Sequence, residues 1–288
     1  MIQREFGNTG EKVSVLGMGT APLGLQNYQG KDDVLEQDAI ALIQECVNCG
    51  VTYFDTAPVY GKKIQVSGWN SDRRSEMILG KALEKVPRDK VFIATKNMYD
   101  RTEPGMIRKS LEDSLRLLHT DYVDLFQIHG YFALPYRADN WRDFVTDTVI
   151  EEITKLKEEG KCRYLGISGW REGGICAAIE SNIFQAVMPL FNYFYRGAEW
   201  ELVKLAEKNG TAVVPMRPLT GNLMSKEFSD IPTEMYQKLG LVKRAINYLL
   251  SFSVVSTLPV GMRTIEELYE NLEIIEECEK IRDTDNLE

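Results

Sequence analysis

Four side chains have types and spacing that suit proton transfer: Asp55, Tyr60, Lys96 and His129. Asp55, Lys96 and His129 each end a short apolar segment that is typical of a buried strand, and Tyr60 follows Asp55 by five residues. A buried carboxylate costs free energy unless a cation pairs with it. A buried lysine likewise loses its charge unless a carboxylate lies beside it. We therefore expect Asp55 and Lys96 to pair.

Such a pair would change the acidity of Tyr60. A phenol has an unperturbed pKa of about 10 and is a poor acid near neutral pH. The Lys96 ammonium would stabilise the phenolate and lower the pKa of Tyr60, so that Tyr60 could donate a proton to a carbonyl oxygen. His129 could hydrogen-bond the same oxygen. Each residue alone has a commoner structural use, as a turn cap, a surface lysine or a core histidine. Together, at the ends of consecutive strands, they favour an active site.

The elements that would position these residues alternate along the whole chain. Short apolar segments predict strands at 13–18, 51–55, 91–96, 122–129, 164–168, 186–191, 211–216 and 253–257. Amphipathic segments predict helices at 39–49, 75–83, 103–118, 150–159, 174–181, 199–209, 233–250 and 265–279. Eight alternations over residues 1–288 without a linker predict one α/β domain, a (β/α)8 TIM barrel, whose strand ends converge on one rim. A doubly wound open sheet is the alternative.

Two connections on that rim are longer than a barrel needs, residues 61–74 and 130–149. They carry several aromatic side chains, among them Trp69, Tyr131 and Trp141. These rings could form the walls of a substrate pocket, or they could pack beneath the loops. The sequence favours neither reading.

Charge and composition argue against several other classes of function. The net charge of −9 and the pI of about 5.0 argue against nucleic acid or an anionic membrane as partner. We expect neither a signal peptide nor a membrane span, because no segment is apolar for long enough. Five cysteines, an odd count, suit a reducing cytoplasm. With only two histidines we expect no metal site. The oligomeric state cannot be read from the sequence.

Eight segments carry a family resemblance. In chain order they are KVSVLGMGTAPLG, VTYFDTAPVYG, RRSEMILGKAL, VFIATKN, YVDLFQIHG, EEITKLKEEGKCRYLGIS, RPLTGNL and YEN. In these segments, and over almost its whole length, the chain resembles an aldo-keto reductase. The resemblance implies a (β/α)8 barrel with Asp55, Tyr60, Lys96 and His129 as its catalytic tetrad. It also implies an NAD(P)H-dependent oxidoreductase that reduces an aldehyde or ketone to an alcohol, or catalyses the reverse. Hydride would come from nicotinamide C4 and the proton from Tyr60.

The same resemblance implies the residues that would contact the cofactor. They are Gly19, Thr20, Asp55, Ser168, Met188, Met216, Arg217, Pro218, Leu219, Gly221, Leu223, Gly261, Met262, Arg263, Glu267 and Asn271. Arg217 could neutralise the pyrophosphate, and Arg263 could bind a 2′-phosphate. Glu267, however, stands where many NADPH-binding members carry a positive residue. We expect NADP(H), with NAD(H) as the alternative.

Three residues depart from the family's pattern around the nicotinamide. Gly169 follows Ser168 where members commonly have Asn, Met188 takes the place of a Gln, and Met216 takes the place of a stacking aromatic residue. Methionine can cover a ring face but cannot hydrogen-bond a carboxamide strongly. These departures leave open a second function, that of a nicotinamide-binding regulatory or sensing subunit with little turnover.

Overall fold

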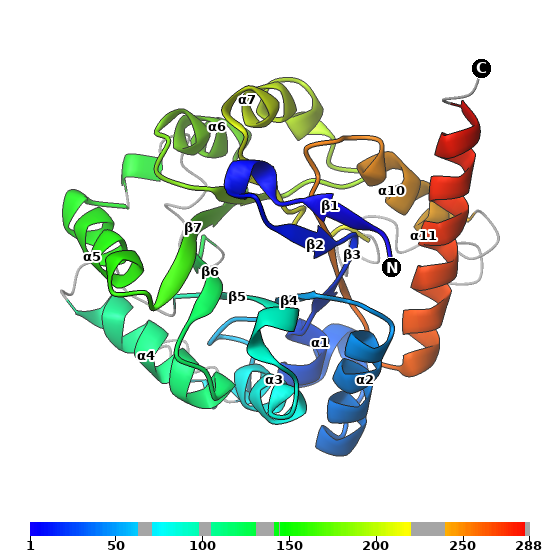
Figure 1. The fold of residues 1–288 in the computed structure, drawn as a ribbon, viewed down its shortest axis with the longest axis horizontal. Helices are drawn as coiled ribbons and strands as arrows, with labels where there is room; N and C mark the ends of the chain where they lie inside the picture. The colour runs from blue at the N-terminus through cyan, green and yellow to red at the C-terminus, as the bar shows by residue number, and fades with distance from the viewer. Residues whose placement is uncertain (63–70, 98–104, 131–140, 144, 220–239, 286–288) are drawn as a thin grey trace.

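The computed structural model describes residues 1–62, 71–97, 105–130, 141–143, 145–219 and 240–285. In this part of the chain, eight parallel strands form one sheet in the order β10-β3-β4-β5-β6-β7-β8-β9 (Figure 1). The strands are β3 (Leu16–Gly19), β4 (Tyr53–Asp55), β5 (Phe92–Lys96), β6 (Val123–Ile128), β7 (Cys162–Gly169), β8 (Ala186–Pro189), β9 (Ala212–Val213) and β10 (Leu258–Gly261). The predicted (β/α)8 barrel is confirmed.

The sheet closes through the segment that precedes β10. Val213 of β9 forms a parallel bridge with Val255. The Val213 N–H donates to Val254 O, and the Ser256 N–H donates to Val213 O, both at 3.1 Å. Consequently the first and last strands of the order are joined, which the alternative of an open sheet does not allow.

Helices surround the barrel and follow one another around it in Figure 1. They are α1 (Ala21–Gly24), α2 (Glu36–Asn48), α3 (Arg74–Leu83), α4 (Met106–Leu118), α5 (Asp147–Glu158), α6 (Glu172–Glu180), α7 (Leu202–Asn209), α10 (Leu241–Leu250) and α11 (Ile265–Asp285). The predicted helix 233–250 corresponds to α10, and residues 233–239 lie outside the described residues. No helix among the described residues is long and apolar enough to cross a membrane.

Two strand predictions were wrong in part. The predicted strand 13–18 is divided between β2 (Lys12–Ser14) and β3, and β2 pairs with the unpredicted β1 (Gln3–Glu5) in an antiparallel hairpin. The predicted last strand 253–257 lies just before β10 and contributes only the bridge to β9. The apolar pattern located both regions but not the strand boundaries within them. It did not show the break between β2 and β3, or that β10 begins only after residue 257.

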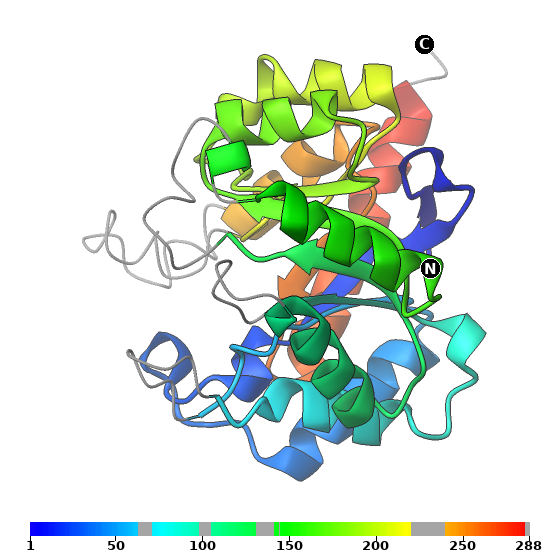
Figure 2. The same cartoon turned by 90° about the vertical axis from the view of Figure 1, so that its left-hand side faces the viewer.

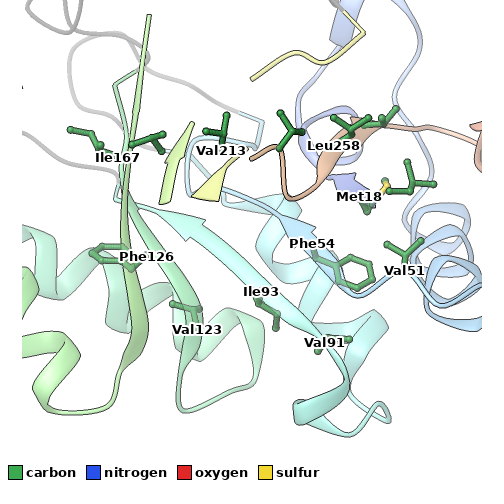
Figure 3. Close-up of a cluster of buried hydrophobic side chains, with 14 of the residues drawn as sticks. Met18, Val51, Phe54, Val91, Ile93, Val123, Phe126, Ile167, Val213 and Leu258 are labelled. Carbon is green, nitrogen blue, oxygen red and sulfur yellow. The ribbon is translucent and has the colours of Figure 1, made fainter. Parts of the chain in front are cut away.

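Alternate residues of the strands face two different layers of the core. Outward-facing residues such as Phe54, Ile93, Phe126 and Ile167 pack against the helices, and Figure 3 shows several of them side by side. Inward-facing residues occupy the barrel interior. On β5, for example, Phe92 and Ala94 point inward and Ile93 points outward. This period of two is what places Lys96 inside the barrel.

The N-terminal hairpin covers one end of the barrel and adds an apolar plug. Figure 2 shows it on the right of the molecule. Its Phe6 ring lies 4.7 Å from Phe92 and 6.2 Å from Tyr53, and the Tyr53 and Phe92 rings are stacked at 5.4 Å. Gly17 of β3 leaves room for this layer, because a β-carbon there would lie 3.0 Å from the Tyr53 ring. The plug closes the end opposite the candidate site.

Candidate active site

A buried ion pair joins the ends of β4 and β5. The Lys96 ammonium donates to both carboxylate oxygens of Asp55, at 2.6 and 2.8 Å, and to Thr56 O at 2.9 Å. Only 1% of Lys96 is exposed. β4 and β5 are neighbours in parallel register, which brings the two strand ends together although they are far apart in sequence. The expected pair between Asp55 and Lys96 is therefore present.

Burial and the ion pair shift the pKa values of Asp55 and Lys96 in opposite directions. Burial raises the pKa of Asp55, whereas the Lys96 charge and its hydrogen bonds lower it. Burial lowers the pKa of Lys96, whereas the Asp55 carboxylate raises it. Each charge is thus supported by its partner against the cost of leaving water.

Tyr60 lies next to this pair, with its hydroxyl 3.4 Å from the Lys96 ammonium. The ammonium is 5.1 Å from the centre of the Tyr60 ring. The backbone around Tyr60 is held closely, since its N–H donates to Ala57 O at 3.0 Å and its carbonyl accepts from Ser75 N at 2.9 Å. Helix α1 approaches the same carbonyl so closely that a β-carbon at Gly24 would lie 2.1 Å from it. Tyr60 itself is half-buried.

His129 follows β6 and faces Tyr60. The two rings meet edge to face, with centroids 6.3 Å apart. The backbone N–H of His129 donates to the Asn97 side-chain oxygen at 2.7 Å, which connects the end of β6 to the end of β5. Burial, followed by the positive charge of Lys96, lowers the pKa of His129 well below its ordinary value. His129 is therefore a neutral imidazole near neutral pH. One of its ring nitrogens can donate a hydrogen bond and the other can accept one.

The residues predicted around the nicotinamide lie at or just after the carboxyl-terminal ends of β7, β8 and β9. The Ser168 hydroxyl is buried, accepts from Gly130 N at 2.9 Å and donates to Ile128 O at 3.3 Å. Met188 lies in the barrel interior, and Met216 packs against the same cluster. A β-carbon at Gly169 would lie 2.9 Å from the end of the Ile175 side chain. Since Ile175 belongs to the outer layer of the core, position 169 faces the helices.

Arg217 lies on the same rim and is fixed from two sides. Its guanidinium lies 5.0 Å from the centre of the Trp170 ring. Its carbonyl accepts a hydrogen bond from the Asn192 amide at 3.2 Å. Arg217 has a φ of 56°, an unusual left-handed conformation for a residue with a β-carbon. Pro218 is buried and Leu219 packs against the core, whereas the predicted contacts Gly221 and Leu223 lie outside the described residues.

Of the two predicted contacts at the end of β3, Thr20 supports Asp55 directly. Both its N–H and its hydroxyl donate to Asp55 O, each at 2.9 Å. Thr20 is fully buried. Gly19 pairs in register with Asp55 and with Gly261. These residues therefore lie around the strand end that carries the ion pair.

The segment predicted to bind the adenosine phosphate begins α11. One nitrogen of the Arg263 guanidinium, Nη2, donates to Asp32 O, while the buried Nη1 has no hydrogen-bond partner among the described residues. The Glu267 carboxylate accepts from Arg263 N at 2.6 Å, and Asn271 donates to Glu267 O at 2.6 Å. Glu267 thus caps the start of the helix. Gly261 is exposed, and Met262 is buried in the core.

The predicted pocket aromatics have different outcomes. Trp69 and Tyr131 lie outside the described residues. Trp141 is only 3% exposed and packs edge to face against Phe184 at 5.3 Å, in the outer layer of the core. Its expected role as a pocket wall is therefore corrected to core packing, which was the alternative.

Three further features lie outside the candidate site. A cavity of about 380 Å³ lies at the hairpin end of the barrel and includes Thr9 and Tyr164 in its lining, so it is separate from the candidate site. In the part of the chain that the structure describes, no cluster of three or more His, Cys, Asp or Glu residues is placed to hold a metal ion. All five cysteines are free, and burial raises the pKa of Cys46 to about 12, which makes it unreactive.

Sequence reasoning missed several residues of the site. Gln127 donates to the Asp55 carboxylate at 3.4 Å, and its position two residues before His129 on the same face of β6 was a usable signal. Thr56 supplies the third acceptor for Lys96 through its backbone, which no side-chain pattern reveals. The Trp170 ring lies against the Arg217 guanidinium, a contact between residues that follow β7 and β9 and that no local pattern reveals.

Comparisons with known proteins identify the family and agree with the fold. The model of the aldo/keto reductase family matches residues 15–239. The chain is 29% identical to an Arabidopsis thaliana protein named L-galactose dehydrogenase, over 96% of this chain and 89% of that protein. Among solved structures, it is similar to the holo form of aldo-keto reductase AKR11C1 from Bacillus halodurans, with 27% identity and a TM-score of 0.72, over 96% of this chain and 91% of that one. The thermostable aldo-keto reductase Tm1743, solved with the inhibitor epalrestat, has 26% identity and a TM-score of 0.73, with 99% of both chains covered. The chain therefore belongs to the aldo/keto reductase family of oxidoreductases.

Proposed function

We propose that the protein reduces an aldehyde or ketone to an alcohol, or catalyses the reverse, with a nicotinamide cofactor and with Tyr60 as the proton donor. The observation that carries this proposal is the contact of Lys96 with both Asp55 and the Tyr60 hydroxyl. The ammonium favours the phenolate that forms when Tyr60 gives up its proton. His129 is neutral and faces Tyr60, so it suits the orientation of a carbonyl oxygen better than the donation of a proton.

The described residues suit a dinucleotide cofactor. Arg263 has a buried guanidinium nitrogen without a hydrogen-bond partner among them, which is the kind of donor that a phosphate needs. Arg217 is held over the barrel rim by Trp170 and Asn192. When bound, the cofactor supplies the hydride for the reduction. Arg217 would bind the pyrophosphate and Arg263 a 2′-phosphate, so NADP(H) is the cofactor that this site favours.

The substrate is proposed to be a small carbonyl compound, and aldoses are the first class to test. The relative named L-galactose dehydrogenase motivates this choice, because its name specifies a sugar substrate. In the oxidative direction a sugar hydroxyl would give its proton to the Tyr60 phenolate, which Lys96 stabilises.

Multiple-turnover kinetics test the proposal. Oxidation of NADPH and NADH is followed with a panel of aldehydes, ketones and aldoses, and the reduction of NADP⁺ and NAD⁺ with L-galactose. Cofactor binding is measured separately by fluorescence titration. We expect turnover with at least one carbonyl class. Tight cofactor binding without turnover across the panel would contradict the enzyme and favour the regulatory or sensing subunit that the sequence left open.

A further inference from the structure

The first turn of helix α3 contains two consecutive polar residues, Ser75 and Glu76, neither of which is exposed to solvent. A helix that covers a barrel normally buries apolar side chains. Buried polar side chains need partners there, since an unsatisfied group costs free energy. The partners of both residues lie on the strands and turns that carry the candidate tetrad.

Ser75 connects the start of α3 to the turn between Asp55 and Tyr60. Its hydroxyl lies 2.5 Å from the Thr20 hydroxyl and 2.9 Å from the Thr56 hydroxyl. Its N–H donates to Tyr60 O at 2.9 Å. Since Thr20 donates to Asp55 O, Ser75 fixes the backbone at both ends of this turn.

Glu76 connects the same helix to β5. One carboxylate oxygen accepts from the Thr95 hydroxyl at 2.8 Å. Thr95 directly precedes Lys96 and points to the opposite face of the strand. The other oxygen lies 3.5 Å from the Arg73 guanidinium, which also donates to the Ser114 hydroxyl at 3.3 Å. Glu76 is therefore bound on the strand side and on the helix side at once.

Glu76 is also the second carboxylate that acts on Lys96. Burial raises the pKa of Glu76, and the charge of Arg73 is the largest effect that opposes it. The negative charge of Glu76 raises the pKa of Lys96, in the same direction as the larger effect of Asp55. The first turn of a helix favours a carboxylate as well, because the N-terminal end carries a partial positive charge.

The charged and titratable groups that face Lys96 and Glu76 come from several elements packed against them. Asp55 of β4, Tyr60 of the following turn, Glu76 of α3 and His129 after β6 act on or face Lys96. Around Glu76 they are Lys96 and Arg73, and Asp113 of α4 lies 3.9 Å from Arg73 on its far side.

We propose that Glu76 is a positioning residue for the proposed carbonyl reduction: its buried carboxylate holds β5 at Thr95 and places a negative charge on the side of the strand opposite the contact of Lys96 with Tyr60. This inference rests on the proposed function. It differs from a purely structural role for Glu76 in one respect that can be measured. Packing requires the shape and hydrogen bonds of the side chain, whereas the proposed role also requires its negative charge.

Glu76→Gln separates these requirements, because glutamine keeps the volume and an acceptor for Thr95 but has no charge. The titration of Lys96 is followed by NMR of the lysine Cε and Nζ in unliganded protein, with Lys96→Met to assign the signal. We expect Lys96 to lose its proton at lower pH in Glu76→Gln than in the wild type. Asp113→Asn is the matched control, since it also removes a carboxylate next to Arg73, and it should leave the titration of Lys96 in place. An unchanged Lys96 titration in Glu76→Gln would overturn the proposal.

Kinetics give the second readout. Lys96 and Tyr60 must both be protonated during reduction, so the alkaline limb of the kcat profile should move to lower pH in Glu76→Gln. On that limb kcat should fall on the order of tenfold, as for a shift of about one pH unit, with KM little changed. Asp113→Asn should keep the wild-type profile. A uniform loss of kcat with an unshifted profile and a lower Tm would assign Glu76 to packing alone. If the wild type shows no turnover, the proposed function fails, while the titration of unliganded protein still tests the charge of Glu76.

Discussion

The two ends of the barrel interior bury different chemistry. At the hairpin end the aromatic rings of Phe6, Tyr53 and Phe92 lie within 4.7 to 6.2 Å of one another. At the other end the inward positions carry charges, with Asp55 and Lys96 in contact at 2.6 Å. The same strands contribute to both ends, since inward-facing residues change from aromatic to ionisable along β4 and along β5.

The aromatic end of the core therefore contributes mainly stability, whereas the charged end carries the groups that suit chemistry. Buried aromatic rings contribute large apolar area and favourable ring contacts. A buried ion pair gives much of its Coulomb energy back as desolvation, so it contributes little net stability. The aromatic end can therefore offset the cost of the charged end. The division agrees with the general rule that barrels keep their active sites at the carboxyl ends of the strands.

The largest expected effect is at the charged end, in Tyr60→Phe. The variant removes the proposed proton donor and should lower kcat by on the order of 10² to 10⁴. Cofactor affinity and Tm should hardly change, because the hydroxyl is at the edge of the core. Steady-state kinetics, cofactor titration and thermal unfolding measure the three quantities. Reduction at a near-normal rate would remove Tyr60 from the role of acid.

The converse change is at the aromatic end, in Phe92→Ala. Loss of a ring that contacts Phe6 and Tyr53 should lower the free energy of unfolding by about 3–5 kcal/mol. The kcat of the folded fraction should remain near that of the wild type, because Lys96 is held by contacts of its own. Urea unfolding and kinetics below the transition test both parts. Phe92→Leu, which keeps apolar volume, should lose less stability. A large loss of kcat in folded Phe92→Ala would show that the two ends are coupled.

An intermediate effect is expected for Arg263→Ala, which tests whether the charged end extends to the cofactor. The variant should weaken NADPH binding by about 1.5–3 kcal/mol, as for the loss of a charged hydrogen bond, and should leave NADH binding nearly unchanged. Fluorescence titrations with both cofactors measure the difference. Equal losses would mean that Arg263 does not recognise a 2′-phosphate. A wild-type preference for NADH would instead point to Glu267 as the residue that sets the choice.

The smallest effect concerns His129 and pH. Burial lowers the pKa of His129 in the folded protein, whereas in the unfolded chain it returns to about 6.5. Below that value the unfolded state binds more protons, so His129 should lower stability as the pH falls. The difference between wild type and His129→Gln should amount to about 1 kcal/mol between pH 7.5 and 5.5. Urea unfolding at both pH values measures it. Identical pH dependence in the two proteins would show that the pKa of His129 is the same in the folded and the unfolded state.

Sequence patterns sufficed for the order of the barrel strands and for the ends of β4, β5 and β6, because alternation and strand ends are local properties. They failed at β10, whose Pro259 and Gly261 suggest a break. The strand tolerates Pro259 because β10 pairs along its length with β3 on one side, so its other side can lack a backbone N–H donor. The role of Trp141 was also left undecided, since a ring on a loop gives no sign of which layer it enters.

The sequence by itself determined which ionisable residues end the strands, and the period of two determined that Lys96 faces the barrel interior. Only the tertiary structure decided the partners. It brought Glu76 and Thr20 to the backbone and strands of the tetrad, placed Trp170 against Arg217, and left His129 neutral. The reason is that contact and desolvation depend on neighbours far away in the chain. The pairing of the strands and the packing of α3 against them set those neighbours, and through them the charge that each buried group can keep.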